Sequence, residues 1–365
     1  MTTLETPVPA SRPQRPLWRR LLGPLLSVVL LAAVFFWFLP QFTSISDVWA
    51  SVKSMSWMEV AVLLLAAVWN LATYQFVVLS TMPGQTFRQA TVSTETTTAV
   101  SNTVLGGAAI SLGLTYAMNS SWGFSRSRTS VSLLVSGLFN NFAKLGLPVL
   151  ALALLLFDSP PSAGRVLGGL AGVAGLVVVV VGLWLLMRSR ESAARLGIVL
   201  GRWASAVIRP FGRPPVQGWD KAMTKFRDRT ALLLHARWYW ITLATLVSHL
   251  SLFLVLLLAL RFVGGDSAQV SWVEALAVFA FARLLTAIPF TPGGLGVVEL
   301  ALITGLSAAG GPRAMVAAAV LIFRALTYVL PIPIGLITYV FWQRNKSWRR
   351  EPNSAPRTEL VPETV

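Results

Sequence analysis

The stretch Thr-Pro-Gly-Gly-Leu-Gly-Val-Val-Glu at residues 291–299 decides the fold of this 365-residue chain. It interrupts a long apolar run with Pro292, Gly293, Gly294 and Gly296, and it ends on a single acid, Glu299. A helix in lipid must satisfy its own backbone hydrogen bonds, so a proline and three glycines predict a break at this point. A break followed by a carboxylate within an apolar segment indicates a site rather than an ordinary span.

The composition indicates a membrane protein. The chain is 55% hydrophobic and 12% charged, its mean hydropathy is +0.67, and it contains repeated apolar runs of about 20 residues or more. It has no cysteine, which excludes disulfides, thiolate nucleophiles and cysteine metal sites. Its two histidines, His235 and His249, do not provide a histidine-rich metal site, so we expect neither a metal nor a cofactor.

The net charge of +16 is concentrated beside the apolar runs. Basic residues cluster at 12–20, 188–237 and 344–350, which is the pattern of cytoplasmic flanks that also attract anionic lipid headgroups. This pattern explains the charge without nucleic acid. We therefore expect a multi-pass protein of the cell membrane with both termini in the cytoplasm.

Six apolar segments are long enough to cross a bilayer, at 21–40, 57–80, 134–157, 166–187, 238–262 and 315–339. The first resembles a signal peptide, but it is longer than a typical signal core, so a retained anchor is expected. If the basic flanks are cytoplasmic, residues 91–120 must start and end on the cytoplasmic side. By the same argument, residues 271–310 must start and end on the outer side. Each segment is split by glycines into arms too short to span, which predicts two re-entrant helical hairpins. For 91–120, an ordinary polar-lined span is the alternative.

The two halves of the chain share one order of features. Gly106-Gly107 corresponds to Gly293-Gly294, and the interval from Asn141 to Pro148 corresponds to the interval from Arg324 to Pro331 at a constant offset. Each unit is a span, a broken hairpin and a span, and the units have opposite orientation. This is the inverted-topology repeat of many transporters.

The predicted organisation is therefore an all-α polytopic membrane protein of about six full spans and two re-entrant hairpins. A basic cytoplasmic tail (1–20) precedes the membrane domain (21–342), and a disordered cytoplasmic tail (343–365) follows it. Within the membrane domain, repeat one (57–157) and repeat two (238–339) flank the basic loop 188–237.

Three charged residues lie within the apolar runs of the second unit: Arg283, Glu299 and Arg324. A lone charge in lipid is costly, so these side chains are expected to face each other or a wet cavity. In one interpretation they form a buried ion pair or triad that fixes the hairpin against the last span. In the other, one arginine binds an anionic headgroup, for which its planar fork is suited, and Glu299 either holds that arginine in place or exchanges with the phosphate during transport.

The first unit is less charged at the matching positions. Asn141 occupies the place of Arg324, and Lys144, about one turn further on, can supply the missing cation. Asn102 and Glu95 belong to the polar set of the first hairpin, much of which can be packing. The predicted substrate-binding residues are Arg283, Glu299, Arg324, Lys144, Asn141 and Asn102.

The motif at 289–299, the upstream Arg283 and the run Asn-Thr-Val-Leu-Gly-Gly at 102–107 resemble the transmembrane region of lysylphosphatidylglycerol synthases. The wider flippase-like membrane family shares that region, and the resemblance extends over roughly residues 20–342. It implies movement of aminoacylated phospholipid or another lipid-borne substrate between leaflets. It also implies roles for the Gly-Gly break, Glu299 and Arg283.

Two features differ from that pattern. No acyltransferase-type domain follows the membrane region, so lipid aminoacylation is not expected. The first motif has no proline before its glycines, and Phe139-Asn140-Asn141 stands where the family has a charged pair.

The sequence leaves three functions open. The first is a translocase for an anionic lipid or a lipid-linked glycan, which needs no ATP site and would be driven by another gradient or by that of the substrate itself. The second is a scaffold that binds a partner enzyme through loop 188–237, which contains an amphipathic stretch at 193–208. The third is an intramembrane enzyme with Glu299 as base, which neighbouring arginines disfavour by holding the acid ionised. No Walker, dinucleotide, HExxH or GxSxG motif is present, so we do not expect an enzyme.

Overall fold

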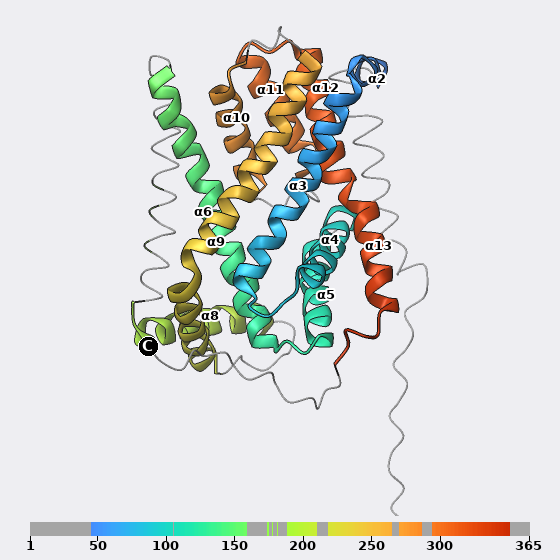
Figure 1. Cartoon of the computed structure of the whole chain (residues 1–365). Helices are drawn as coiled ribbons and strands as arrows, with labels where there is room; N and C mark the ends of the chain where they lie inside the picture. Colours follow the sequence, from blue (N-terminus) through green and yellow to red (C-terminus); the bar gives the residue numbers. More distant parts are fainter. Residues whose placement is uncertain are drawn as a thin grey trace, which may run out of the picture.

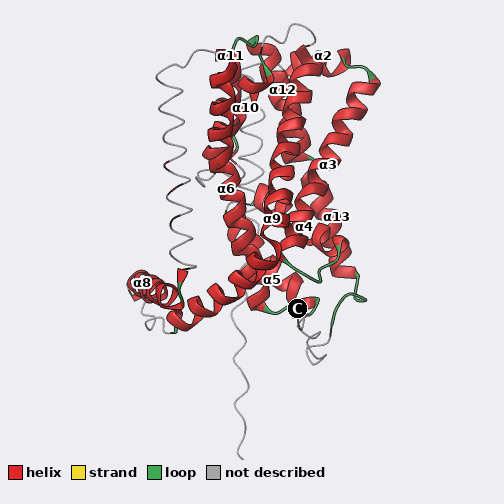
Figure 2. Ribbon diagram, turned by 60° about the vertical axis from the view of Figure 1, so that its left-hand side comes forward, coloured by secondary structure: helices red, strands yellow, loops and turns green. Residues whose placement is uncertain are grey.

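The computed structural model describes residues 45–104, 106–158, 188–209, 218–264, 270–286 and 294–350, together with the single residues 174, 177 and 181. Within these ranges every regular element is a helix (Figures 1 and 2). The predicted spans at 21–40 and 166–187 fall outside the described residues, apart from those three positions. So do Pro292 and Gly293 of the predicted break.

Four of the described helical segments are long and apolar enough to cross a membrane, which confirms the polytopic helical class. They are α3 (Trp57–Thr81), α6 (Arg126–Asp158), α9 (Trp219–Gly264), and the continuous helix formed by α12 (Arg313–Arg324), η6 (Ala325–Val329) and α13 (Pro331–Arg344). They correspond to four of the six predicted spans. A short helix, α2 (Ile45–Ser54), precedes α3.

Shorter helices form two hairpins between the long ones. α4 (Phe87–Thr103) packs against α5 (Gly107–Ser121), and α10 (Trp272–Leu285) packs against α11 (Val297–Ala308). The first hairpin lies in the lower half of the molecule and the second in the upper half (Figure 1). The two hairpins therefore occupy opposite ends of the bundle.

A glycine with positive φ begins the second arm of each hairpin. Gly106 has a φ of +72° and precedes α5, and Gly296 has a φ of +83° and precedes α11. Residues with a Cβ rarely adopt this conformation, so a glycine is required at both positions. Gly107 is required for space, because a Cβ there would overlap the Val100 carbonyl of the opposite arm.

The two hairpins are held differently. The largest buried apolar cluster is built from α6, α9, α10, α11 and α12, so the second hairpin is embedded in the core. The first hairpin lies mainly along α13, where a Cβ on Gly335 would overlap the Glu95 carbonyl oxygen and the Ala99 Cβ. On the other side of the bundle, α3 packs on α9, and Asn70 Nδ2 donates to Ser251 Oγ at 2.9 Å. This bond is the interhelical contact expected for a lone polar residue in a span.

Much of the predicted basic loop 188–237 is helical. α8 (Arg190–Ile208) covers the predicted amphipathic stretch, and α9 begins at Trp219, well before the predicted span. α8 lies at the lower end of the molecule and packs on the first turns of α9 (Figures 1 and 2). Its exposed apolar side chains are Leu196, Ile198, Val199, Leu200 and Trp203.

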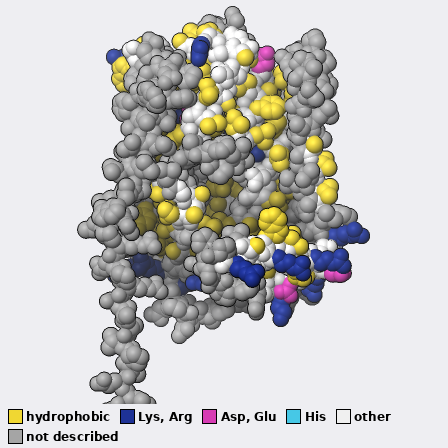
Figure 3. Space-filling view, turned by 180° about the vertical axis from the view of Figure 1, so that it is seen from behind, with side chains coloured by type: hydrophobic (Ala, Val, Ile, Leu, Met, Phe, Trp, Pro, Cys, Tyr) yellow, Lys and Arg dark blue, Asp and Glu magenta, His cyan; other side chains and the backbone are white. Residues whose placement is uncertain are grey.

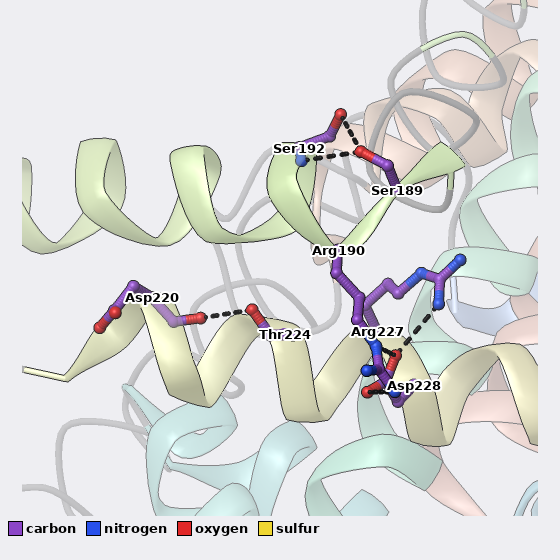
Figure 4. A network of polar contacts seen from close by, with 7 residues as sticks. All are labelled: Ser189, Arg190, Ser192, Asp220, Thr224, Arg227 and Asp228. Atoms are coloured by element: carbon purple, nitrogen blue, oxygen red, sulfur yellow. Dashed lines mark hydrogen bonds and ion pairs between the residues drawn. The ribbon is translucent and has the colours of Figure 1, made fainter.

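An ion pair between Arg190 and Asp228 joins α8 to the charged first part of α9, and a second pair there lies within α9 (Figure 4). Asp228 Oδ2 lies 3.0 Å from Arg190 Nη2, and Asp228 Oδ1 lies 3.0 Å from Arg227 Nη1. The hydrogen bonds from Arg227 and then Arg190 hold the pKa of Asp228 below its ordinary value. The side chain of Ser189 caps α8 by accepting from the Ser192 N–H at 3.1 Å.

The chain after α13 packs back onto the first hairpin. The Arg350 N–H donates to the Ser121 carbonyl at 3.0 Å, and the Trp348 ring lies edge-on to Trp122 with centroids 6.1 Å apart. Packed structure therefore continues to residue 350, beyond the predicted domain boundary at 342.

Candidate functional site

Glu299 and Arg324 form a buried ion pair between the second hairpin and the last span. Glu299 is 2% exposed, and its Oε1 accepts from Arg324 Nε at 2.6 Å. Its Oε2 accepts from the Gly296 N–H at 2.8 Å, so the carboxylate also satisfies a free donor at the start of α11. An anion is stabilised in the first turn of a helix. An ion pair between the hairpin and the last span is one of the two interpretations that the sequence left open, and this contact is consistent with it. The part of these residues in substrate binding stays a prediction.

A chain of contacts continues from Arg324 to the first hairpin through Tyr328. The Arg324 guanidinium lies over the Tyr328 ring, 4.6 Å from its centroid. Tyr328 donates its hydroxyl to the Asn102 carbonyl at 2.5 Å, and Asn102 Nδ2 donates to the Tyr328 carbonyl at 3.1 Å. The two hairpins are therefore linked through two residues of the last span, Arg324 and Tyr328.

Tyr328 was not among the predicted site residues. It lies in η6, the turn that widens to π-helical geometry just before Pro331, which lacks an N–H to continue the ladder. Its position four residues after an intramembrane arginine, beside a proline, is the signal that would have found it.

Arg283 stands apart from the ion pair. It lies in the last turn of α10, and its Nε is buried without a hydrogen-bond partner among the described residues. The like charges of Arg324 and Lys144 act on it. A buried guanidinium nitrogen without an acceptor is costly, so this position has unused capacity to bind an anion.

Lys144 on α6 and His249 on α9 extend the same region, because both interact electrostatically with Arg283. His249 is 5% exposed, and its Nδ1 lies 3.0 Å from the Thr245 carbonyl. A carbonyl can only accept, so the proton is assigned to Nδ1, and Nε2 is left buried without a partner in the described part of the chain. Lys144, Arg283, Arg324 and Glu299 thus bring three cations and one carboxylate together between the helices. We call these four residues, with His249, the charged centre.

The remaining predicted residues divide between the hairpin breaks and the surface. Asn102 belongs to the link described above, while Asn141 is exposed on α6. Gly106 and Gly107 form the first break, and Gly294 and Gly296 lie at the second, both with positive φ. No group of three potential metal-ligating side chains occurs in the described ranges.

An apolar cavity of about 670 Å³ lies along α10, next to the turn that carries Arg283, although Arg283 itself is not among its lining residues. It is lined by α6, α10 and α11, and the lining includes both sequence neighbours of Arg283, Ala282 and Leu284. Further lining residues are Leu152, Leu155, Phe281, Leu285 and Gly305. Glu274 is the charged residue of this lining, and its Oε2 accepts from the Ser271 N–H at 3.0 Å. The cavity therefore combines an apolar wall with a nearby cationic region.

This fold and this charged centre define a multi-pass helical membrane protein with an intramembrane polar site. Comparison with protein families gives a match to the lysylphosphatidylglycerol synthase transmembrane region over residues 24–335. The chain belongs to that family, and the resemblance seen in its motifs is confirmed.

Individual relatives match over a short segment. The phosphatidylglycerol lysyltransferase of Staphylococcus haemolyticus (strain JCSC1435) is 32% identical over 73 residues. The protein of the same name from Staphylococcus aureus (strain COL) is 34% identical over 74 residues. Each match covers 20% of this chain and 9% of the relative. The chain thus aligns with a small part of these relatives, and their activity is not carried over by this similarity.

Proposed function

We propose that the protein moves an anionic or aminoacylated lipid, or a lipid-linked glycan, between the leaflets of the cell membrane, and that it is not an enzyme. The observation that carries the proposal is the unbalanced positive charge of the charged centre. The region contains three interacting cations and one carboxylate, which is bonded to Arg324, and the Nε of Arg283 has no acceptor among the described residues. An anionic headgroup would supply both the missing charge and the missing acceptor.

The arrangement of the hairpins supports an alternating-access mechanism. We propose that α4–α5 is re-entrant from the cytoplasmic side and α10–α11 from the outer side, as the two halves of an inverted repeat. The hairpins lie at opposite ends of the bundle (Figure 1). Lys and Arg side chains gather near the lower end on the face shown in Figure 3, which favours that end as cytoplasmic. We also propose that both termini are cytoplasmic, because basic residues cluster at 12–20 and 344–350 of the sequence.

The residues take different parts in this mechanism. Arg283 and Lys144 would bind the phosphate of the headgroup, and the cavity along α10 would hold part of an acyl chain. The Glu299–Arg324 pair would brace the second hairpin against the last span, because both Glu299 oxygens already have donors. Tyr328 and Asn102 would transmit a movement of one hairpin to the other.

The test is translocation of a labelled anionic lipid in vesicles that contain the purified protein. Arg283→Gln removes the proposed phosphate ligand, and loss of one charge-assisted bond of about 1.5–3 kcal/mol corresponds to a rate at least about tenfold lower. Arg88→Gln is the matched control, because Arg88 is an exposed arginine on the first hairpin. Equal rates for wild type and Arg283→Gln, with both proteins folded, would reject the site.

α8 favours a second candidate function, a scaffold that binds a partner enzyme. Trp203 is 72% exposed and belongs to the apolar side chains listed above for this helix. Replacing Val199, Leu200 and Trp203 by serine tests this function without removing any of α9. A scaffold would lose its partner completely, whereas a translocase would keep its transport rate.

A further inference from the structure

Glu95 is a buried acid that the charged centre does not use. It lies on α4, is 3% exposed and contacts Gln75 of α3, which is 1% exposed. Gln75 Nε2 donates to Glu95 Oε1 at 2.9 Å and to the Leu71 carbonyl at 3.3 Å. Both amide protons of Gln75 are thus in use, and Glu95 Oε2 receives no donor from it.

Two acceptor atoms are left without a donor at this contact. Glu95 Oε2 and Gln75 Oε1 are both buried and have no hydrogen-bond partner among the described residues. Glu95 also has no ion pair there, in contrast to Glu299. Besides Glu95, the titratable side chains on α4 and on the described elements packed against it are Glu59, Tyr74, Arg88, Tyr116, Tyr328, Tyr339 and Arg344, and none of them bonds to Glu95.

One proton would satisfy both atoms. A carboxylate without a cation is costly in a low-dielectric interior, and so is a buried acceptor without a donor. A carboxylic acid and a primary amide can each donate to and accept from the other. The existing bond from Gln75 Nε2 is one half of such a pair, and an O–H on Glu95 Oε2 directed at Gln75 Oε1 would supply the other half.

We propose that Glu95 and Gln75 form a proton-binding site in the first hairpin. On uptake, a proton from water forms the O–H bond at Glu95 Oε2 and the acid–amide pair closes. On release, that bond breaks, the proton returns to water and a carboxylate remains. Since the carboxylate lacks a cation in this packing, release requires that α4 separates from α3 and water reaches Glu95.

The position of Glu95 connects this step to the charged centre. Asn102 lies seven residues further along α4, on the same helical face, and is bonded to Tyr328. Displacement of α4 therefore pulls on the residue that stacks under Arg324. Coupling of translocation to a proton gradient follows, and this part of the inference rests on the proposed function.

Infrared spectroscopy of the purified protein in lipid tests the site without any transport. We expect the carbonyl band of a protonated, buried carboxylic acid near neutral pH, with the small shift that exchange into heavy water produces. Glu95→Gln should lose this band and remain folded, because glutamine can make both bonds to Gln75. Glu299→Gln and the exposed Glu191→Gln should keep it, and Gln75→Leu should shift it. A spectrum of Glu95→Gln identical to that of wild type would overturn the proposal.

Transport with and without a pH gradient tests the coupling. Wild-type translocation should respond to the gradient, and Glu95→Gln should lose that response. A response retained in Glu95→Gln would overturn the coupling, while the infrared band would still decide the proton site. Absence of any translocation by wild type would instead reject the proposed function.

Discussion

Arg283 and Arg324 are both arginines of the charged centre, yet their removal should have opposite effects on stability. Arg324 Nε donates to Glu299 at 2.6 Å. By contrast, Arg283 Nε has no acceptor in the described chain, and the positive charge of Arg324 repels the Arg283 guanidinium. Breaking a buried pair by removing one partner costs about 3–5 kcal/mol, since the other charge is left uncompensated. Removing a cation that is only repelled costs little and relieves that repulsion. We therefore expect Arg324→Gln to lower the free energy of unfolding by about 3–5 kcal/mol and Arg283→Gln to leave it unchanged or raise it.

The assay is reversible unfolding of the purified variants in mixed micelles. Glu299→Gln should cost about as much as Arg324→Gln, and the double variant should cost less than the two single variants together, because no buried charge is left unpaired. The exposed Arg88→Gln should change the free energy by no more than about 0.5 kcal/mol. Comparable destabilisation by Arg283→Gln and Arg324→Gln would refute the reasoning, because it would mean that Arg283 has a partner of equal strength.

Three further predictions concern packing, backbone and pH. Gly335→Val should lower the unfolding temperature, at a cost of about 1–3 kcal/mol, because the new side chain meets the Glu95 carbonyl; a denaturation temperature equal to that of wild type would contradict the close approach. Gly296→Ala should cost about 1–2 kcal/mol in the same unfolding assay, because φ is +83° there, and no loss would show that the turn relaxes freely. The pKa of Asp228 is lower in the folded protein than in the unfolded chain. The bonds of its carboxylate to Arg190 therefore stabilise α8 fully at pH values above the unfolded pKa, and this stabilisation is lost as the pH falls through the lower, folded pKa. Hydrogen exchange in α8 should therefore accelerate below about pH 3.9, and in Asp228→Asn already at neutral pH; exchange independent of both changes would show that α8 is held by other contacts.

The hydropathy of the chain predicts its class and four of its long helices, because a span must supply about 20 apolar residues whatever it packs against. Glycine chemistry likewise predicts both breaks, since Gly106 and Gly296 adopt a backbone conformation that other residues avoid. The cost of an isolated charge in lipid predicts that Glu299 needs a cation or a wet cavity, and this holds for any arrangement of the helices.

The arrangement around that pair required the tertiary structure. By sequence offset, Asn141 matches Arg324, yet Asn141 is exposed on α6 while Arg324 faces Glu299. Helical spacing places a residue on a turn, but the rotation of that turn toward its neighbours is set by packing with other helices. The same limit applies to Tyr328, which a π-turn presents to Asn102 across more than two hundred intervening residues. It also applies to Glu95, whose contact with Gln75 joins two helices that the sequence leaves unpaired.

The sequence by itself therefore predicted which segments are apolar enough to enter a membrane, where the hairpins break and which charges cannot stay alone. Those outcomes depend on the free energy of single residues and single helices in lipid. Only the tertiary structure decided that Glu299 pairs with Arg324 and not with Arg283, and that Glu95 is hydrogen-bonded to the amide of Gln75. These choices depend on distances between helices that are far apart in the chain, and the packing of α4, α10 and α13 sets those distances.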